Sequence, residues 1–240
     1  MILPRSQDAI HRMYLLRLLM AILDDAQTNS RLAFKGGTAA VLAGWLDRFS
    51  LDLDFDLIGE GDRNALMIHL NTLYGQCGLA VKQQSRSGAY TVLSYEAPAG
   101  QRNTLKVSIM TTKISANRYT PVFLGDINRY ALCQTRDTMV ANKLVAPVER
   151  FEKHKTIAGR DIYDIHYFLS HGYTFREEVI QERRGVKSSV YLGTLIEFIT
   201  RRVTSRILTE DLNYLLPAPR FQVIRKILKE EAILLLQQRI

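Results

Sequence analysis

The sequence is poor in cysteine, with only Cys77 and Cys133 among its 240 residues. Two cysteines are too few for a disulfide framework or a zinc-binding cysteine cluster. We expect both thiols to be small buried groups, and we expect the protein to reside in the reducing cytoplasm. Long hydrophobic runs are also missing, because Arg17 interrupts the run 14–23 and the run 39–46 is short. A membrane span needs about 18 apolar residues, so none is expected. The first seven residues lack the basic-then-apolar order of a secretory signal.

Acidic residues are the minority among the charged ones. The chain has 24 Asp and Glu against 32 Lys and Arg, a net charge of +8, and the basic excess is spread over both halves. Such an excess favours encounter with polyanions such as nucleic acids or nucleotides, although a basic protein without an anionic partner has the same composition. Apolar residues make up 47% and charged residues 23%, which excludes a disordered or collagen-like chain.

The hydrophobic pattern predicts an α/β layer followed by helices. Strand patterns occur at 32–34, 51–57, 80–84, 89–95 and 104–110, and helical patterns at 8–26, 39–46 and 63–76. After residue 136 the patterns are helical, at 137–149, 161–170, 175–184, 189–205 and 221–238. We therefore predict an α+β protein with a mixed sheet in an α/β domain at 1–135 and a helical domain at 136–240, their boundary lying within 112–136.

The predicted strand 51–57 carries Asp52, Asp54 and Asp56 on one face, and its apolar residues on the face toward the core. Carboxylates two residues apart on a strand are separated by roughly 6.6 Å and repel each other unless a cation lies between them. A hard ion such as Mg²⁺ suits this arrangement, since it takes its other ligands from water and phosphate. Two such ions can stabilise the attacking and leaving oxygens of a nucleotidyl transfer. A solvated strand face without metal would carry the same Asp-x-Asp triplet.

A glycine turn precedes this strand. Gly36, Gly37 and Thr38 lie between a strand and a helix, where backbone N–H groups can face an anion and the threonine hydroxyl can cap the helix or bind phosphate. The spacing is not that of a P-loop, and an ordinary tight turn has the same residues. The combination is more informative. A phosphate-binding turn and a metal-binding strand, joined by a short helix, are the plan of a nucleotidyltransferase palm.

Four motifs in the same order resemble those of the AbiEii/AbiGii-type nucleotidyltransferase-like toxins. They are Phe34-Lys35-Gly36-Gly37-Thr38-Ala39, Arg48-Phe49-Ser50-Leu51-Asp52-Leu53-Asp54-Phe55, Asn142-Lys143-Leu144 and Arg160-Asp161-Ile162-Tyr163-Asp164-Ile165. The resemblance covers about 30–170, and the final 70 residues or so match no motif. It implies a nucleotidyltransferase-like mixed-sheet palm followed by a C-terminal helical module.

The resemblance also implies a role for each motif residue. Asp52 and Asp54 would ligate Mg²⁺ or Mn²⁺, Lys143 would pair with the nucleotide phosphates, and Asp161 would be a late acidic catalytic residue. The residues that would bind the nucleotide are Lys35, Gly36, Gly37, Thr38, Ser50 and Lys143. Additional candidates are Asp56, Arg160 and Asp164, the last of which could take the role assigned to Asp161.

The implied function is that of a growth-inhibiting toxin of a toxin–antitoxin or phage-defence system. It would use an NTP to modify an RNA acceptor, with the 3′ end of tRNA expected, and would have an antitoxin partner. Two alternatives stay open: a nucleotide-binding module without catalysis that acts through a protein partner, and transfer of the nucleotide onto protein hydroxyls. The sequence leaves the base of the nucleotide open as well.

Two residues depart from the expected pattern. Ser108 lies on the strand 104–110, at a position where many polymerase-like palm domains carry a third carboxylate. Catalysis with a single metal ion, or the loss of catalysis, therefore stays possible. Pro147 has no N–H to donate to the carbonyl of Lys143, so the helix that carries this lysine is expected to kink or end there.

A group of basic residues lies on or beside two predicted helices. Its members are Arg183, Arg184, Lys187, Arg201, Arg202 and Arg206. The group is either a solvated helix face or a surface that contacts the phosphates of RNA.

Overall fold

A computed structural model describes residues 1–87 and 89–240. Within them the strands form one mixed sheet of seven, in the order β3-β4-β5-β2-β1-β7-β6. The strands are β1 (Leu32–Lys35), β2 (Asp52–Leu57), β3 (Ala80–Gln84), β4 (Tyr90–Ser94), β5 (Thr104–Met110), β6 (Tyr119–Leu124) and β7 (Arg129–Gln134). At the centre of the sheet, β2 pairs antiparallel with β1 and parallel with β5. The five strands predicted from the sequence are all present, and the α+β class is confirmed.

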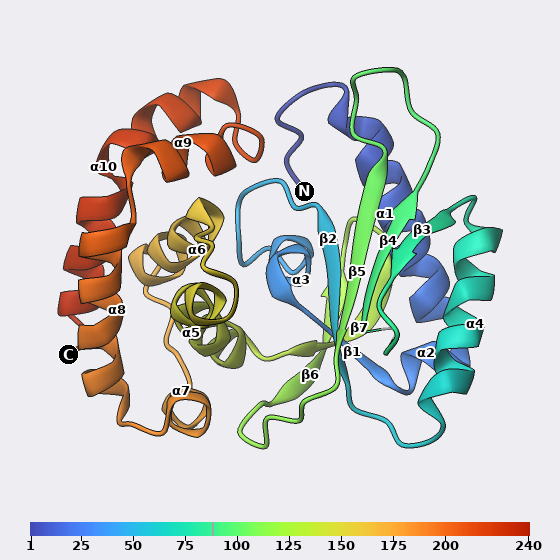
Figure 1. Cartoon of the computed structure of the whole chain (residues 1–240), viewed down its shortest axis with the longest axis horizontal. Helices are drawn as coiled ribbons and strands as arrows, with labels where there is room; N and C mark the ends of the chain where they lie inside the picture. Colours follow the sequence, from blue (N-terminus) through green and yellow to red (C-terminus); the bar gives the residue numbers. More distant parts are fainter. Residues whose placement is uncertain (88) are drawn as a thin grey trace.

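Most helices follow the sheet in the chain. The first are α1 (Asp8–Asp24), α2 (Ala26–Asn29), α3 (Gly36–Leu42) and α4 (Arg63–Gln76). The later ones are α5 (Arg136–His154), α6 (Gly159–Ser170), α7 (Glu177–Arg184), α8 (Ser188–Arg202), α9 (Ser205–Leu212) and α10 (Ala218–Gln237). Figure 1 shows α5–α10 gathered on one side of the sheet, and α1 and α4 on the other side of the view. None of the helices in the described ranges is long and apolar enough to span a membrane.

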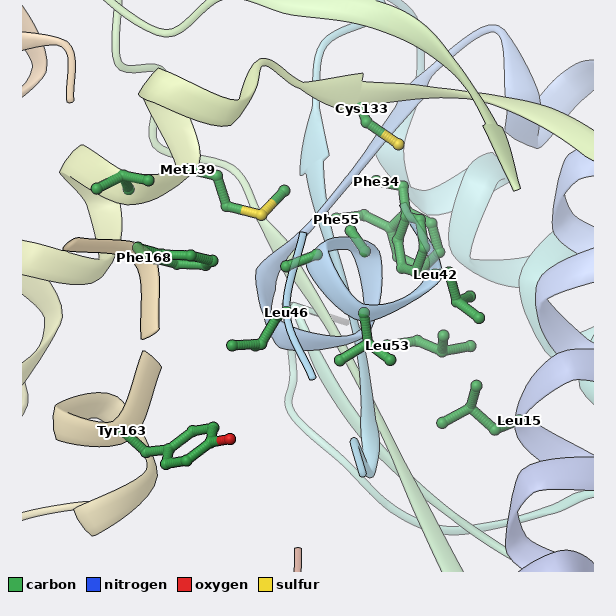
Figure 2. Packing of buried hydrophobic residues seen from close by; sticks show 14 of the residues in the cluster. Leu15, Phe34, Leu42, Leu46, Leu53, Phe55, Cys133, Met139, Tyr163 and Phe168 are labelled. Atoms are coloured by element: carbon green, nitrogen blue, oxygen red, sulfur yellow. The ribbon is translucent and has the colours of Figure 1, made fainter. Parts of the chain in front are cut away.

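The core packs against one face of β2. Leu53 and Phe55 are buried together with Leu15 of α1, Phe34 of β1 and Leu42 of α3 (Figure 2). Since neighbouring side chains on a strand point to opposite faces, the acidic residues of β2 lie on the face away from this cluster. The predicted division of β2 into an apolar and an acidic face is therefore confirmed. The acidic face is directed toward the later helices, α5–α10, hereafter the helical half.

The segment 112–136, expected to hold the domain boundary, contains a β-hairpin. β6 and β7 pair antiparallel, and β7 adds to β1 as a parallel strand. Pro121 obscured this hairpin, because proline cannot donate a hydrogen bond to a strand ladder. β6 is an edge strand, where a missing N–H can face solvent. The sheet thus extends to Gln134, while the proposed domain division at 135/136 stays a prediction.

The helices depart from the sequence pattern at three places. α3 begins at Gly36, so the glycine pair forms its first turn instead of preceding it. α5 continues through Pro147 to His154, which removes the possibility that it ends at the proline. The helix predicted at 189–205 ends at Arg202, and α9 follows with Thr204 as its N-cap, whose side chain accepts from the N–H of Ile207. Hydroxyl residues compete for backbone groups and so divide this stretch into two helices.

The loop 43–51, between α3 and β2, is attached to the helical half by several contacts. The Phe49 N–H donates to the carbonyl of Leu215 at 2.9 Å. The Tyr163 hydroxyl donates to the carbonyl of Asp47 at 3.0 Å, and Arg220 pairs with the Asp47 carboxylate. The acidic strand is therefore entered from a loop that the later helices hold in place.

Candidate active site

A cavity of about 240 Å³ separates the acidic face of the sheet from α5 and α6. From the sheet half it is lined by Gly37, Arg48, Ser50, Leu51, Asp52, Asp54, Tyr90, Lys106 and Ser108, and from the helical half by Lys143, Arg150, Arg160, Asp161 and Leu215. Five of these side chains are basic and three are acidic. The structure thus brings together residues from all four motifs, which are far apart in the sequence.

Asp52 and Asp54 are half-buried neighbours on the cavity wall. Burial from water and the nearby negative charge of Asp52 raise the pKa of the Asp54 carboxyl above its usual range, although basic groups including Lys35 and Lys143 act against this. Asp52 has a distant ionic contact with Arg160, at 3.9 Å. The charged form of Asp54 is therefore disfavoured until a cation approaches.

The two carboxylates fit a divalent cation. In the described ranges, the Asp54 carboxylate has no salt bridge and accepts no hydrogen bond, so its oxygens are available as ligands. No group of three or more His, Cys, Asp or Glu side chains suited to a metal occurs there. Mg²⁺ sites commonly use one or two carboxylates and complete their coordination with water and phosphate oxygens. The donor set therefore suits a metal that arrives with a phosphate ligand.

The first residues of α3 fit closely around the acidic strand. Gly36 has φ +77°, and a Cβ at this position would lie 2.5 Å from Oδ2 of Asp54. A Cβ on Gly37 would lie 2.5 Å from Nη2 of Arg48. At both positions a larger residue would collide with a neighbouring side chain. Gly36 also has a left-handed backbone conformation, which favours glycine.

Thr38 is buried and holds the segment that leads into β2. Its hydroxyl contacts the backbone carbonyl of Asp52 and the hydroxyl of Ser50, the latter at 2.8 Å. Of the two hydroxyl residues, Ser50 lines the cavity. Thr38 thus positions Asp52 and Ser50, while Ser50 is the one placed to meet a ligand.

Lys35 and Asp56 form a pair beside the cavity. Nζ of Lys35 lies 2.6 Å from Oδ1 of Asp56. Oδ2 of Asp56 accepts hydrogen bonds from Tyr119, at 3.0 Å, and from Gln134, at 2.7 Å. This buried carboxylate already has three donors, whereas Asp54, two residues earlier, has none among the described side chains.

The later motifs meet in a buried ionic network. Arg48 donates two hydrogen bonds to Asp164, at 2.5 and 2.8 Å, and Nζ of Lys143 lies 2.7 Å from the same carboxylate. Burial alone would raise the pKa of Asp164, but the charges of Arg48 and Lys143 lower it to about 2. Asp161 lies on the cavity wall, 3.6 Å from Lys143 and 3.1 Å from Arg150. Asp164 is thus enclosed in the network, whereas Asp161 faces the cavity.

Ser108 occupies the position next to Asp54 on the neighbouring strand. In the parallel pairing of β2 with β5, Asp54 is opposite Ser108 and Asp52 is opposite Lys106. Both β5 residues line the cavity. The strand on which many palms carry a third carboxylate therefore presents a hydroxyl and an ammonium group to the cavity.

The sequence matches a family model along most of its length. The model is described as nucleotidyl transferase AbiEii toxin, type IV TA system, and it matches residues 17–226. The chain belongs to this AbiEii family. Membership makes it a nucleotidyltransferase of a toxin family and implies a nucleotide substrate and an antitoxin partner. A search of curated proteins finds no significant match.

Solved structures share the fold of this AbiEii nucleotidyltransferase. A protein from H. pylori described as a nucleotidyltransferase is 19% identical, with a TM-score of 0.59 over 98% of this chain and 95% of that one. JHP933 from Helicobacter pylori is 16% identical, with a TM-score of 0.54 and coverage of 98% and 95%. MenT4, a nucleotidyltransferase toxin from Mycobacterium tuberculosis H37Rv, is 18% identical, with a TM-score of 0.56 and coverage of 97% and 86%.

Three basic residues of the cavity in this AbiEii chain were not predicted as site residues from the sequence: Arg48, Lys106 and Arg150. Arg150 follows Lys143 by seven residues, which places both on one face of α5. Lys106 precedes Ser108 by two residues and shares its face of β5. These two could have been found from periodicity. Arg48 begins the second motif, but its role could not be found from periodicity, because it depends on hydrogen bonds to Asp164 of α6.

The basic group on the later helices is largely neutralised by neighbouring carboxylates. Its ion pairs are Arg183–Glu149, Arg184–Glu152, Arg201–Glu197 and Arg206–Glu210. Arg202 lies over the ring of Phe151, with 5.1 Å between Cζ and the ring centroid. This arrangement favours a solvated, paired helix face over a phosphate-binding surface.

Proposed function

We propose that this enzyme transfers a nucleotidyl group from an NTP, bound with Mg²⁺ or Mn²⁺, to an RNA acceptor, the 3′ end of tRNA. One observation carries the proposal: Asp52 and Asp54, the latter without an ion pair among the described residues, share a small cavity with five basic side chains. A triphosphate needs cations around it, and a metal ion needs carboxylates beside it. The cavity supplies both in one place.

The side chains divide between holding the metal and holding the phosphates. Asp52 and Asp54 would ligate the metal, which when bound would offset the charge that develops at the reacting phosphate. Gly37 of the glycine turn and Ser50, which both line the cavity, would contact the triphosphate, and Thr38 would hold Ser50 in place. Lys143 and Arg150 would pair with its oxygens, since both cationic side chains line the same cavity as Asp52 and Asp54. Catalysis would depend mainly on positioning the acceptor hydroxyl in line with the α-phosphate.

The biological role that we propose is growth inhibition inside the cytoplasm, controlled by a cognate antitoxin. Adding nucleotides to the tRNA 3′ end would block aminoacylation and so stop translation. The net charge of +8 is consistent with an RNA acceptor, since basic surfaces favour encounter with polyanions.

The experiment is to incubate the purified enzyme with Mg²⁺, total tRNA and each α-labelled NTP in turn. We expect label in tRNA with wild type, and none with a double variant Asp52→Ala, Asp54→Ala or after removal of divalent metal. The double variant should also lose toxicity on expression. Label in protein but not in RNA would show that the acceptor is a protein and not an RNA. A double variant that stays as toxic as wild type would remove the catalytic explanation of toxicity.

The second candidate function is nucleotide binding without turnover, and Ser108 opposite Asp54 is the observation that favours it. A protein of this kind would still be stabilised by NTP through mass action. An NTP-dependent rise in melting temperature without label in any acceptor would support it.

A further inference from the structure

The active-site cavity continues outward along the beginning of β5. A second cavity of about 160 Å³ shares Asp52, Lys106 and Arg160 with the first. A third, of about 370 Å³, shares Arg102, Thr104 and Tyr214 with the second. Together the second and third cavities form a groove from the acidic strand to the protein surface, hereafter the β5 groove.

The basic side chains of the β5 groove differ from those on α7–α9. Arg102 and Lys106 are exposed, and across residues 1–87 and 89–240 neither forms a salt bridge or side-chain hydrogen bond. In the same ranges, the one ionic contact of Arg160 is that of 3.9 Å with Asp52. The arginines of α7–α9 are instead mostly paired with glutamates. The positive charge of the groove is therefore available to an anionic ligand, whereas most of the charge of the arginines on α7–α9 is neutralised by glutamates.

An aromatic ring stands at the outer part of the groove. Tyr214 is 52% exposed and follows α9. The guanidinium of Arg5 lies over its ring at 4.9 Å and donates to the carbonyl of Asn213 at 3.2 Å. Figure 1 shows the N-terminal segment close to the loop that follows α9. Aromatic rings and guanidinium planes are the surfaces on which unpaired bases stack.

Two carboxylates line the same groove with oxygens that lack a hydrogen bond. Oδ2 of Asp8 and Oδ2 of Asp211 are buried and have no hydrogen-bond partner in the described structure. Such oxygens disfavour a bare phosphate, but they accept from hydroxyl or amino donors. An RNA strand presents both kinds of donor, as 2′-hydroxyl groups and as base amino groups.

The opposite side of Asp54 offers a cavity of a different character. This cavity, of about 220 Å³, has the apolar side chains of Met110, Met139 and Ala146 in its wall. The rest of its lining is Gly36 and the polar or charged residues Lys35, Asp54, Gln134, Asn142, Lys143, Arg150, Asp161 and Arg183. Apolar side chains beside a phosphate-binding turn suit the base of a bound nucleotide. That leaves the β5 groove, on the Asp52 side, for the acceptor.

We propose that the β5 groove binds the single-stranded 3′ end of the RNA acceptor. Arg102 and Lys106 contact its phosphates, Tyr214 stacks on a base, and the chain directs its terminal hydroxyl toward Asp52. This inference rests on the proposed RNA-modifying function and assigns the acceptor side of the same site.

The test measures RNA binding directly, with a 5′-fluorescein-labelled, 12-nucleotide single-stranded RNA bearing a free 3′ hydroxyl. We expect Tyr214→Ala to weaken binding about tenfold with an unchanged salt dependence. Arg102→Gln should weaken binding and lower the slope of log K against log salt by about 0.7, the value for one phosphate contact on a single strand. The NTP-induced rise in melting temperature should stay at the wild-type value in both variants.

Matched controls come from elsewhere on the surface. Tyr130→Ala removes a tyrosine that is 68% exposed on β7, and Arg201→Gln removes a paired arginine of α8. Both should bind the RNA as wild type does. Equal binding by the groove variants and wild type, or no RNA binding by wild type, would overturn the inference. So would displacement of the RNA by an acidic peptide more readily than by unlabelled RNA.

The same variants separate this inference from the proposed function. If wild type labels tRNA and the groove variants keep its KM for tRNA, the function stands and the groove assignment is wrong. If no tRNA is labelled while the groove variants lose RNA binding, the groove assignment stands and the transfer reaction is wrong.

Discussion

The guanidinium of Arg48 holds the carboxylate of Asp164 through two hydrogen bonds, of 2.5 and 2.8 Å, with both side chains almost wholly removed from water (3% and 0% exposed). Arg48 belongs to the loop ahead of the acidic strand and Asp164 to α6. The same guanidinium lies close to Gly37 of the glycine turn, where an added Cβ would be 2.5 Å from its Nη2. This single pair therefore connects the two halves of the active site.

Asp164→Asn should destabilise the enzyme by about 3–5 kcal/mol, because it leaves the buried charges of Arg48 and Lys143 without their partner. Urea unfolding measures the change. Glu210→Gln is the control, since it breaks the exposed pair with Arg206 and should cost less than about 1 kcal/mol. Equal losses in the two variants would show that the buried network does not stabilise the fold.

Gly36→Ala should reduce nucleotidyl transfer far more than Gly100→Ala does. Both glycines have nearly the same φ, +77° and +78°, so the backbone strain of about 1–2 kcal/mol is common to both. A Cβ at Gly100 meets nothing within 4 Å, whereas one at Gly36 would displace the Asp54 carboxylate. We expect similar melting temperatures and a loss of activity of at least about tenfold in Gly36→Ala alone. Equal activity in the two variants would mean that the position of Asp54 is not critical.

The parts of the site that the sequence revealed are those held by local pattern. Alternation along β2 placed Asp52 and Asp54 on one face, and the glycine pair marked the turn ahead of it. What the pattern could not supply is set by long-range contact. The hairpin β6–β7 was hidden because Pro121 is unfavourable in a strand except at an edge, and whether a strand is an edge depends on the whole sheet.

Asp54→Asn should make the ligand-free protein more stable, by on the order of 1 kcal/mol, while abolishing activity. Burial and the charge of Asp52 raise the pKa of the Asp54 carboxyl, which means that its charged form is unfavourable without a cation. Chemical denaturation in the presence of a chelator checks the stability. The control Asp24→Asn removes an exposed carboxylate that pairs with Arg129, and it should bring no such gain. A loss of stability in Asp54→Asn would contradict the proposed repulsion.

The protein should lose stability as the pH falls from about 6.5 to about 4. His11 is buried, with Nδ1 2.6 Å from the Tyr95 hydroxyl and Nε2 2.9 Å from the Leu51 carbonyl, and burial lowers its pKa to about 4. The unfolded chain binds a proton near pH 6.5 and the folded chain only near pH 4, so the stability present at neutral pH is lost over this interval. The change from this residue is about 3 kcal/mol. Denaturant unfolding at several pH values measures it.

A His11→Gln variant provides the comparison for this pH effect. Its stability at neutral pH can be lower, but the fall between pH 6.5 and pH 4 should be smaller by about 3 kcal/mol than that of wild type. Parallel curves for the two proteins would show that other groups account for the acid sensitivity.

The loop 43–51 has a consequence for how such an enzyme can evolve. Its contacts with Leu215, Tyr163 and Arg220 join the acidic strand to three different later helices or loops. A chimera that combined the sheet of this protein with the helices of a distant relative would lose these matched pairs together. The two halves are therefore expected to be inherited as one unit, and recombination between relatives should succeed at the outer hairpin more often than near residue 136.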